Sequence, residues 1–138
     1  MKKIILDTNA YTRLLAGSEE VLDIISTADS LYMSIFVLGE LYAGFSSGLK
    51  EQKNRETLNR FLLKPTVKIL NATIETAEIF GMLKSRLKIA GTPLPINDVW
   101  IAAHAIETGS IVVTFDKHFN KISGIRLWHH TENPEHQD

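Results

Sequence analysis

Acidic side chains stand at four places in the sequence where a folding chain would normally carry apolar or neutral residues. Asp7 follows the apolar run IIL, and Asp116 follows VVTF. Glu40 lies within the apolar helical segment IFVLGELYAGF, and Asp98 lies at the start of a second one, NDVWIAAHA. A carboxylate among apolar groups costs free energy unless a cation or hydrogen-bond donors compensate it. The four residues therefore require a common chemical explanation.

Each acid also has an ordinary structural explanation when it is taken alone. Asp7 can cap the helix after it, and Asp116 can cap the turn DKHF. Asp98 can lie in the first turn of a helix that Asn97 caps, near the positive end of the helix dipole. Glu40 has only apolar or small neighbours on its own helix face, so we expect it on the inward stripe of that helix, where it would need a buried Lys or Arg as a partner, unless the helix is less buried than its sequence suggests.

The expected elements alternate between strands and helices along the chain. The first strand is apolar on both faces, as in a parallel sheet with helices on both sides. Ser34 and Thr73 are placed to cap helices, and Gly91 and Gly109 to end them. This order predicts an α/β fold with a mainly parallel sheet of four to five strands. The expected strands cover 3–7, 30–34, 67–70, 111–114 and 125–128, and the expected helical stretches cover 11–25, 35–45, 49–63, 74–90 and 98–108.

The expected topology brings the four acids together. In open parallel sheets, ligands bind beside the carboxyl ends of the strands. Asp7 and Asp116 come just past two such ends, and Asp98 and Glu40 lie on helices packed beside them. Four carboxylates there would repel one another and could not all stay ionised, and a hard divalent cation removes that conflict. The chain has no cysteine and no histidine pair at metal-binding spacing, which favours Mg²⁺ or Mn²⁺ over zinc.

Composition excludes several classes of function. The 138 residues suit one domain, expected over 1–128, with 129–138 as a polar tail. The net charge of −1 gives no overall attraction for nucleic acid, and the sequence contains no GxGxxG, P-loop or HExxH motif. No stretch approaches the roughly 18 apolar residues of a membrane span. Asp7 ends the first apolar run before it reaches signal-peptide length, so we expect a cytoplasmic protein.

Four segments together resemble the PIN-domain ribonucleases, specifically the VapC-type toxins of bacterial toxin–antitoxin pairs. They are LDTN, GELYAG, NDVWIAAHA and VVTFDKHF, and they occur in the family's order between Lys3 and about Trp128. The resemblance implies a three-layer α/β/α fold and an acidic metal site of Asp7, Glu40, Asp98 and Asp116 that binds Mg²⁺ or Mn²⁺. Thr8, Asn9 and Thr114 would support that site with hydrogen bonds.

The same resemblance implies an activity. A metal-activated water would attack the phosphodiester of an RNA substrate and leave a 5′-phosphate, which makes the protein a hydrolase and an endoribonuclease. Transfer RNA, ribosomal RNA and mRNA are all open as the substrate. Basic residues outside the acidic centre would contact phosphates without reading sequence: Lys50, Lys53 and Arg55 in one stretch, and Lys84, Arg86 and Lys88 in another.

The resemblance also implies partners, namely a cognate antitoxin protein and a second copy of the chain. Apolar residues in excess of what two short helices can bury would form those interfaces: Leu14, Leu15, Tyr42, Phe45 and Leu49. One alternative is a catalytically idle PIN fold that only binds RNA or protein. Another is a haloacid-dehalogenase-like phosphatase, which needs a second Asp two residues after Asp7, where this chain has Asn9.

Overall fold

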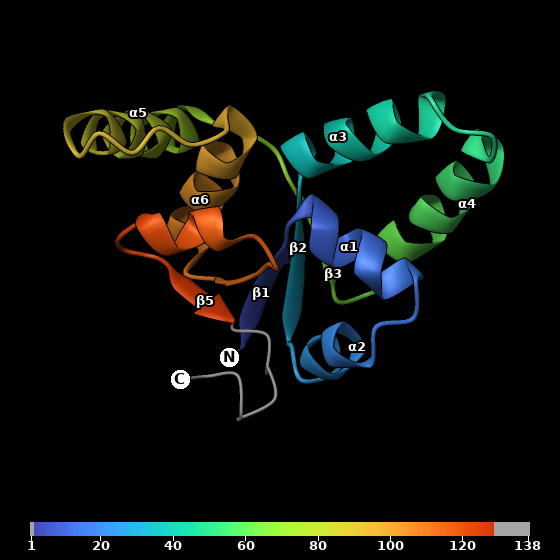
Figure 1. The fold of residues 1–138 in the computed structure, drawn as a ribbon. Helices are drawn as coiled ribbons and strands as arrows, with labels where there is room; N and C mark the ends of the chain where they lie inside the picture. Colours follow the sequence, from blue (N-terminus) through green and yellow to red (C-terminus); the bar gives the residue numbers. More distant parts are fainter. Residues whose placement is uncertain (1, 129–138) are drawn as a thin grey trace, which may run out of the picture.

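A five-stranded, all-parallel sheet forms the centre of the computed structural model, which describes residues 2–128 (Figure 1). The predicted tail over 129–138 lies outside the described residues. The strand order is β3-β2-β1-β4-β5, so the first strand is the middle one. This confirms the predicted fold class. The strands are β1 (Lys3–Leu6), β2 (Ser30–Ser34), β3 (Val67–Leu70), β4 (Ile111–Val113) and β5 (Arg126–Trp128).

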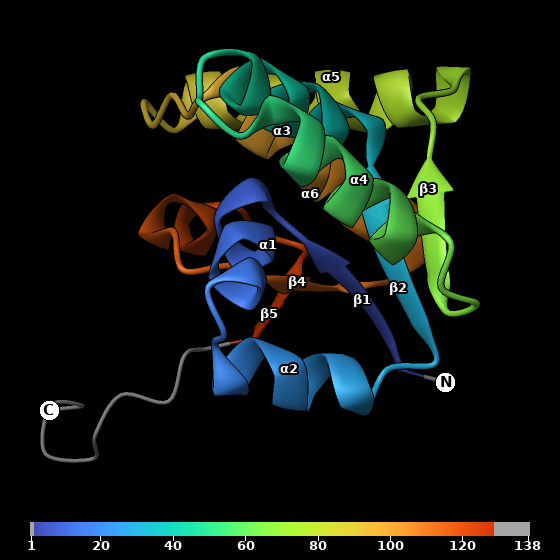
Figure 2. The same cartoon turned by 90° about the vertical axis from the view of Figure 1, so that its right-hand side faces the viewer.

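Helices cover both faces of the sheet. In the two views, α1, α2 and α4 lie on one side of the sheet, and α5 and α6 lie on the other. Helix α3 lies above the carboxyl ends of the strands (Figures 1 and 2). The helices are α1 (Thr8–Leu15), α2 (Glu19–Ser26), α3 (Ile35–Ser46), α4 (Glu51–Leu62), α5 (Ile74–Ile89) and α6 (Ile96–Thr108), with a 3₁₀ helix η1 (Lys117–Lys121) before β5.

The two-sided cover explains why β1 is apolar at successive positions. Ile4, Ile5 and Leu6 are fully buried, and Ile5 pairs with Tyr32 of β2 and Val112 of β4. A strand with helices on both faces has no solvent side, so the usual alternation of apolar and polar residues is lost. The apolar run therefore stops only where the strand stops, at Leu6. Asp7 is the first residue beyond it.

The helical stretch predicted over 11–25 is wrong as a single helix. Gly17 adopts a φ of +91°, a conformation that glycine reaches without a steric penalty, and it separates α1 from α2. The Ser18 hydroxyl then caps α2 by accepting a hydrogen bond from the Val21 N–H at 3.3 Å. The break changes the direction of the chain between α1 and α2, so the two helices meet at the turn that joins them. A trough remains between these two helices and α4.

The predicted ends of the other helices hold with one exception. Ser34 and Thr73 cap α3 and α5, and Gly109 ends α6 in the left-handed conformation with a φ of +70°. The last of these helices begins two residues earlier than predicted, with Pro95 at the cap position and no side-chain cap. Asn97 therefore lies inside the helix, and the predicted capping role for it is wrong.

A buried polar network joins α3 to α6. The Ser34 hydroxyl accepts from the Phe36 N–H at 3.1 Å and lies 3.0 Å from Nδ1 of His104, whose Nε2 lies 3.2 Å from the Asn71 carbonyl oxygen. A neutral ring with its proton on Nε2 satisfies all three groups, and burial lowers the pKa of His104 in agreement with that state. His104 is a fully buried helix residue. Because α3 carries Glu40 and α6 carries Asp98, the network fixes the two helices on which those acids depend.

Among residues 2–128, no helix is both long and apolar enough to span a membrane.

Candidate metal centre

Asp7 lies at the carboxyl end of β1, beside the end of β4. Its side chain is 4% exposed. One carboxylate oxygen, Oδ1, accepts a hydrogen bond from the Ala10 N–H at 2.8 Å and so caps α1, while Oδ2 accepts from the Thr114 hydroxyl. The Thr114 oxygen also accepts from the Asp116 N–H at 2.9 Å. The predicted capping role is therefore real, and the same residue also faces the site.

Asp98 contributes a buried carboxylate oxygen that has no donor. The residue lies in the first turn of α6, its side chain is 16% exposed, and Oδ2 makes no hydrogen bond among the described residues. Ile101 and Ala102, one turn further on, are buried. A buried carboxylate oxygen without a donor carries an uncompensated desolvation cost. Such an atom is suited to binding a cation or an ordered water.

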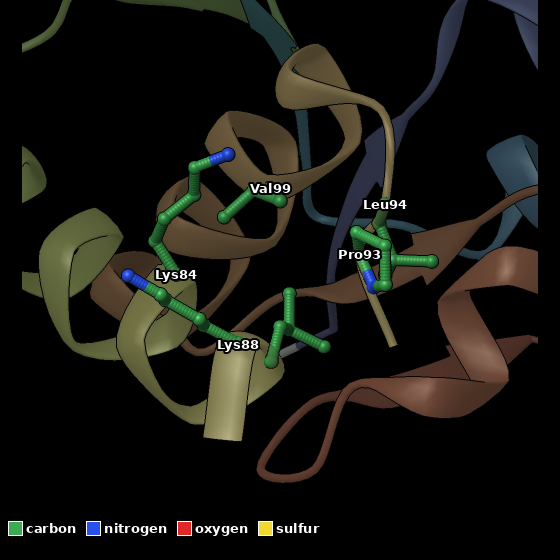
Figure 3. A pocket seen from close by; sticks show the side chains of 6 residues that line it. Lys84, Lys88, Pro93, Leu94 and Val99 are labelled. Atoms are coloured by element: carbon green, nitrogen blue, oxygen red, sulfur yellow. The ribbon is translucent and has the colours of Figure 1, made fainter. Parts of the chain in front are cut away.

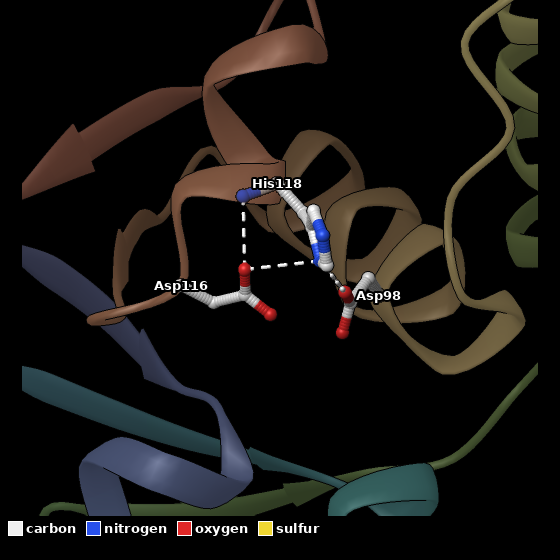
Figure 4. Close-up of side chains that lie close together, drawn as sticks. All are labelled: Asp98, Asp116 and His118. Carbon is white, nitrogen blue, oxygen red and sulfur yellow. Dashed lines mark hydrogen bonds and ion pairs between the residues drawn. The ribbon is translucent and has the colours of Figure 1, made fainter.

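Asp116 and His118 complete one side of the site (Figure 4). Asp116 caps η1 by accepting the His118 N–H at 2.9 Å, and Nδ1 of His118 lies 3.1 Å from the same carboxylate oxygen. Nδ1 also lies 3.8 Å from Oδ2 of Asp98. Sequence reasoning placed His118 only in a surface cluster of basic residues. The overlooked signal is the tight turn after Asp116. Such a turn can bring the side chain two positions after an acidic residue back over that residue.

Glu40 is exposed, so the prediction that it lies on the inward stripe of its helix is wrong. The buried stripe of α3 is formed by Val37, Leu38, Leu41 and Phe45, and Glu40 falls beside it. The Thr8 hydroxyl donates to Oε1 of Glu40 at 2.9 Å and holds it toward α1. The residue is therefore at the solvent edge of the site, with its other oxygen free to contact water.

The charges of the four acids interact, although among the described residues only Asp98, Asp116 and His118 bring ligand atoms within 4.8 Å of one another. Burial raises the pKa of Asp7, against the hydrogen bonds from Thr114 and Ala10, and the charges of Asp116 and Glu40 raise it further. Burial also raises the pKa of Asp98 to about 6, with added contributions from Asp116, Asp7 and Glu40. Residues 109 positions apart in the sequence thus act on one another through space, as the strand order requires.

The donor set fits a divalent cation. No Lys or Arg within residues 2–128 forms an ion pair with any of the four acids, and their ion-pair contacts within that range are with the His118 ring alone. Thr8 and Thr114 make the hydrogen bonds expected of supporting residues, whereas the exposed Asn9 side chain makes none to the acids in the described part of the chain. A group of carboxylate oxygens at one site, without cationic partners, is the environment that Mg²⁺ and Mn²⁺ prefer.

Two basic regions differ in how free their side chains are. On α4, Arg55 pairs with Glu51 at 3.5 Å and lies over the Tyr42 ring at 4.7 Å, while Lys53 and the preceding Lys50 are exposed. On α5, the exposed Lys84 and Lys88 border a pocket of about 260 Å³ whose apolar lining is Leu87, Pro93, Leu94 and Val99 (Figure 3). Arg86 between them is exposed as well.

An apolar trough of about 480 Å³ lies between α1, α2 and α4. Leu15 and Leu22 are 44% and 56% exposed at its rim, and Arg60 and Lys64 stand along one side. Not every residue predicted for an interface is available, because Phe45 is 7% exposed and belongs to the core. The lining is Leu14, Leu15, Leu22, Ile25, Leu31, Thr57, Arg60, Phe61, Lys64, Thr66 and Val67.

Comparisons with known proteins agree with this geometry. The family model of the PIN domain matches residues 4–125. Ribonuclease VapC2 of Haemophilus influenzae is 30% identical over 96% of this chain and 98% of its own length. A tRNA(fMet)-specific endonuclease VapC of Salmonella typhimurium is 28% identical over 92% and 97%. The crystal structure of DNA-bound VapBC from Salmonella typhimurium aligns with a TM-score of 0.83 at 27% identity, over 93% of this chain and 98% of that one.

The pKa of Asp98 predicts how stability changes with pH in metal-free protein. Between its unfolded pKa of 3.8 and its folded pKa of about 6, the folded state binds more protons, so the free energy of unfolding falls as pH rises through that window. Asp98→Asn removes this cost. In EDTA, the variant should exceed the wild type by up to about 3 kcal/mol at pH 7.5, and the difference should shrink toward pH 4.

Urea unfolding at several pH values measures that difference. Asp23→Asn, an exposed acid on α2, is the matched control and should show no such pH dependence. A difference between Asp98→Asn and wild type that stays constant from pH 4.5 to 8 would show that Asp98 is not in a strained electrostatic environment.

Proposed function

The chain belongs to the PIN-domain family, among the VapC ribonucleases, and from this premise we propose that it is a Mg²⁺- or Mn²⁺-dependent endoribonuclease and the toxin of a toxin–antitoxin pair. As such it would be a cytoplasmic hydrolase of RNA phosphodiester bonds, with residues 1–128 as a single PIN domain. The observation that carries the proposal is the buried Asp98 oxygen without a donor, whose carboxylate interacts electrostatically with three further acids. A divalent cation held by Asp7, Asp98 and Asp116 would offset the repulsion among all four acids.

The roles of the side chains follow from their surroundings. Asp7, Asp98 and Asp116 would hold the cation, which when bound supplies an acidified water and neutralises charge on the phosphate. Thr114 and the Ala10 N–H fix both oxygens of Asp7, so that carboxylate cannot rotate away from the site.

Glu40 has a different role because it is open to solvent. Thr8 holds one of its oxygens, and Oε2 remains available to accept a proton from the attacking water. A buried carboxylate could not exchange that proton with solvent, so the exposure that contradicts the sequence prediction suits the chemistry.

The substrate is RNA, and a tRNA is one candidate because the Salmonella typhimurium relative is named as specific for tRNA(fMet). Lys84, Arg86 and Lys88 on α5, together with Lys50, Lys53 and Arg55 on α4, would contact its phosphates. The α5 lysines are the better candidates for phosphate contacts. They border a pocket whose apolar floor can accommodate a base while their ammonium groups contact the phosphates of the RNA backbone.

The first prediction concerns the metal. Mg²⁺ or Mn²⁺ should raise the melting temperature of the wild type by mass action, since the cation binds only the folded arrangement of acids. Asp7→Asn keeps the shape and the Ala10 cap but removes a charged ligand. It should abolish both the metal-dependent rise, measured by calorimetry, and RNA cleavage. Equal stabilisation of wild type and variant by metal would place the cation elsewhere.

Asp23→Asn is again the control, and it should keep both the metal response and the activity. Metal binding without any RNA cleavage by the wild type would favour the catalytically idle PIN fold.

The second prediction concerns the basic residues. In the inactive Asp7→Asn background, changing Lys84 and Lys88 to Ala should weaken binding of single-stranded RNA. Each lost phosphate contact should reduce the slope of log K against log salt by roughly 0.7. Changing Lys50 and Lys53 should have a similar but smaller effect, and Lys64→Ala, beside the trough, should have none. An unchanged slope in the α5 variant would make those lysines an ordinary solvated helix face.

Protein partners form part of the same proposal, because the structural relatives from Rickettsia felis and Salmonella typhimurium were solved as VapBC assemblies. The trough between α1, α2 and α4 suits an amphipathic helix of an antitoxin, with Arg60 and Lys64 meeting its acidic residues. One end of α1 borders the trough and the other begins at Asp7, so a bound chain that continues along α1 can set a basic side chain against the carboxylates.

Self-association would use a different surface. Apolar residues outside the trough remain exposed, among them Ile74, Ile89 and Ile96, and we propose that they contribute to a homodimer.

The third prediction concerns the trough. Leu22→Glu places a charge at an exposed rim position, so the fold should persist while capture of the co-expressed antitoxin, encoded beside the toxin, is lost. Met82→Glu, exposed on α5 and outside both proposed interfaces, is the control and should keep the antitoxin bound. Co-purification measures both. Retention of the antitoxin by Leu22→Glu would move the binding surface away from the trough.

A further inference from the structure

His118 lies closer to the metal centre than a surface histidine needs to be. Its backbone N–H is held by Asp116 at 2.9 Å, and this short turn brings the ring back over the carboxylates (Figure 4). The side chain is 51% exposed, so burial does not force it into this place. Nδ1, rather than the ring carbons, faces the acids.

The contact with Asp98 is too long to serve as a hydrogen bond. Nδ1 lies 3.8 Å from Oδ2 of Asp98, and that oxygen has no donor within residues 2–128. His118 therefore stands beside the unsatisfied atom without satisfying it. The ring nitrogen therefore lies between two acids, in contact with Asp116 and beyond hydrogen-bond distance of Asp98.

The spacing allows the three side chains to bind one ion. In octahedral coordination with bonds of about 2.1 Å, adjacent ligand atoms are about 3.0 Å apart and opposite ones about 4.2 Å. The 3.1 Å from Nδ1 to Asp116 matches adjacent ligands, and the 3.8 Å to Asp98 lies between the two values, so the Asp98 contact requires a small side-chain adjustment. One ligand atom from each of Asp98, Asp116 and His118 can be chosen so that all three lie within 4.8 Å of one another.

We infer that His118 is itself a ligand of the divalent cation, through Nδ1, beside Asp98 and Asp116. The inference rests on the metal centre of the proposed function and deepens it, because it gives the site a nitrogen donor. Imidazole nitrogen binds first-row transition ions better than it binds Mg²⁺, for which oxygen ligands are preferred. The mixed site should therefore favour Mn²⁺ over Mg²⁺ more strongly than four carboxylates alone would.

Pulsed electron paramagnetic resonance of the Mn²⁺-loaded protein tests direct coordination without measuring activity. The wild type should show modulation from a directly bound ¹⁴N nucleus, and growth with ¹⁵N-labelled histidine should change its frequency. His118→Ala should lose the signal while still binding Mn²⁺ through the acids. Lys117→Ala, the neighbouring exposed residue, should keep it.

Calorimetric titration supplies a second readout. The ratio of the Mg²⁺ dissociation constant to that of Mn²⁺ should fall by about tenfold or more in His118→Ala, and it should stay unchanged in Lys117→Ala. Bound Mn²⁺ without nitrogen modulation in the wild type, or an unchanged ratio in His118→Ala, would overturn the inference and leave the metal centre intact. Failure of the wild type to bind Mn²⁺ at all would overturn the metal centre and this inference with it.

Discussion

Repulsion between carboxylates at one edge of a parallel sheet is the constraint on which the rest of this structure depends. Adjacent parallel strands end on the same side, so the acids that follow β1 and β4 must lie together. Asp98 and Glu40 are added from helices that begin or pass at that edge. The raised pKa values of Asp7 and Asp98 express the cost of burial first and the cost of that repulsion second.

Much of the surrounding structure holds the acids in place without removing that cost. Thr114 and the start of α1 occupy both oxygens of Asp7, and Thr8 restrains Glu40. Further away, the Ser34–His104 pair fixes α3 against α6. These groups are neutral donors and acceptors, so they orient charge but do not cancel it. The remaining repulsion is what the proposed cation would offset.

Local sequence signals were sufficient wherever a residue acts on its own neighbours. The caps at Ser34 and Thr73, the stop at Gly109 and the strand over 67–70 all depend on a few consecutive residues, and each was predictable. The convergence of the acids could be predicted because the carboxyl ends of parallel strands lie at the same edge of the sheet. Glu40 failed because its helical neighbours, Gly39 and Ala43 among them, are small residues that suit an exposed face as well as a buried one. Only packing of α3 through Leu38 and Leu41 decides between the two.

Other errors arose where a tight turn or a tertiary neighbour decided the outcome. Gly17 divides a helical pattern that looks continuous, and the turn after Asp116 brings in His118. From the sequence, Phe45 was counted among the surplus apolar residues expected at an interface, but in the structure it is buried in the core.

If the converging acids hold a single divalent cation, anomalous diffraction from crystals soaked in Mn²⁺ should show it. We expect a strong peak bounded by Asp7, Asp98 and Asp116. No peak there, or peaks only at other surface acids, would contradict this metal site.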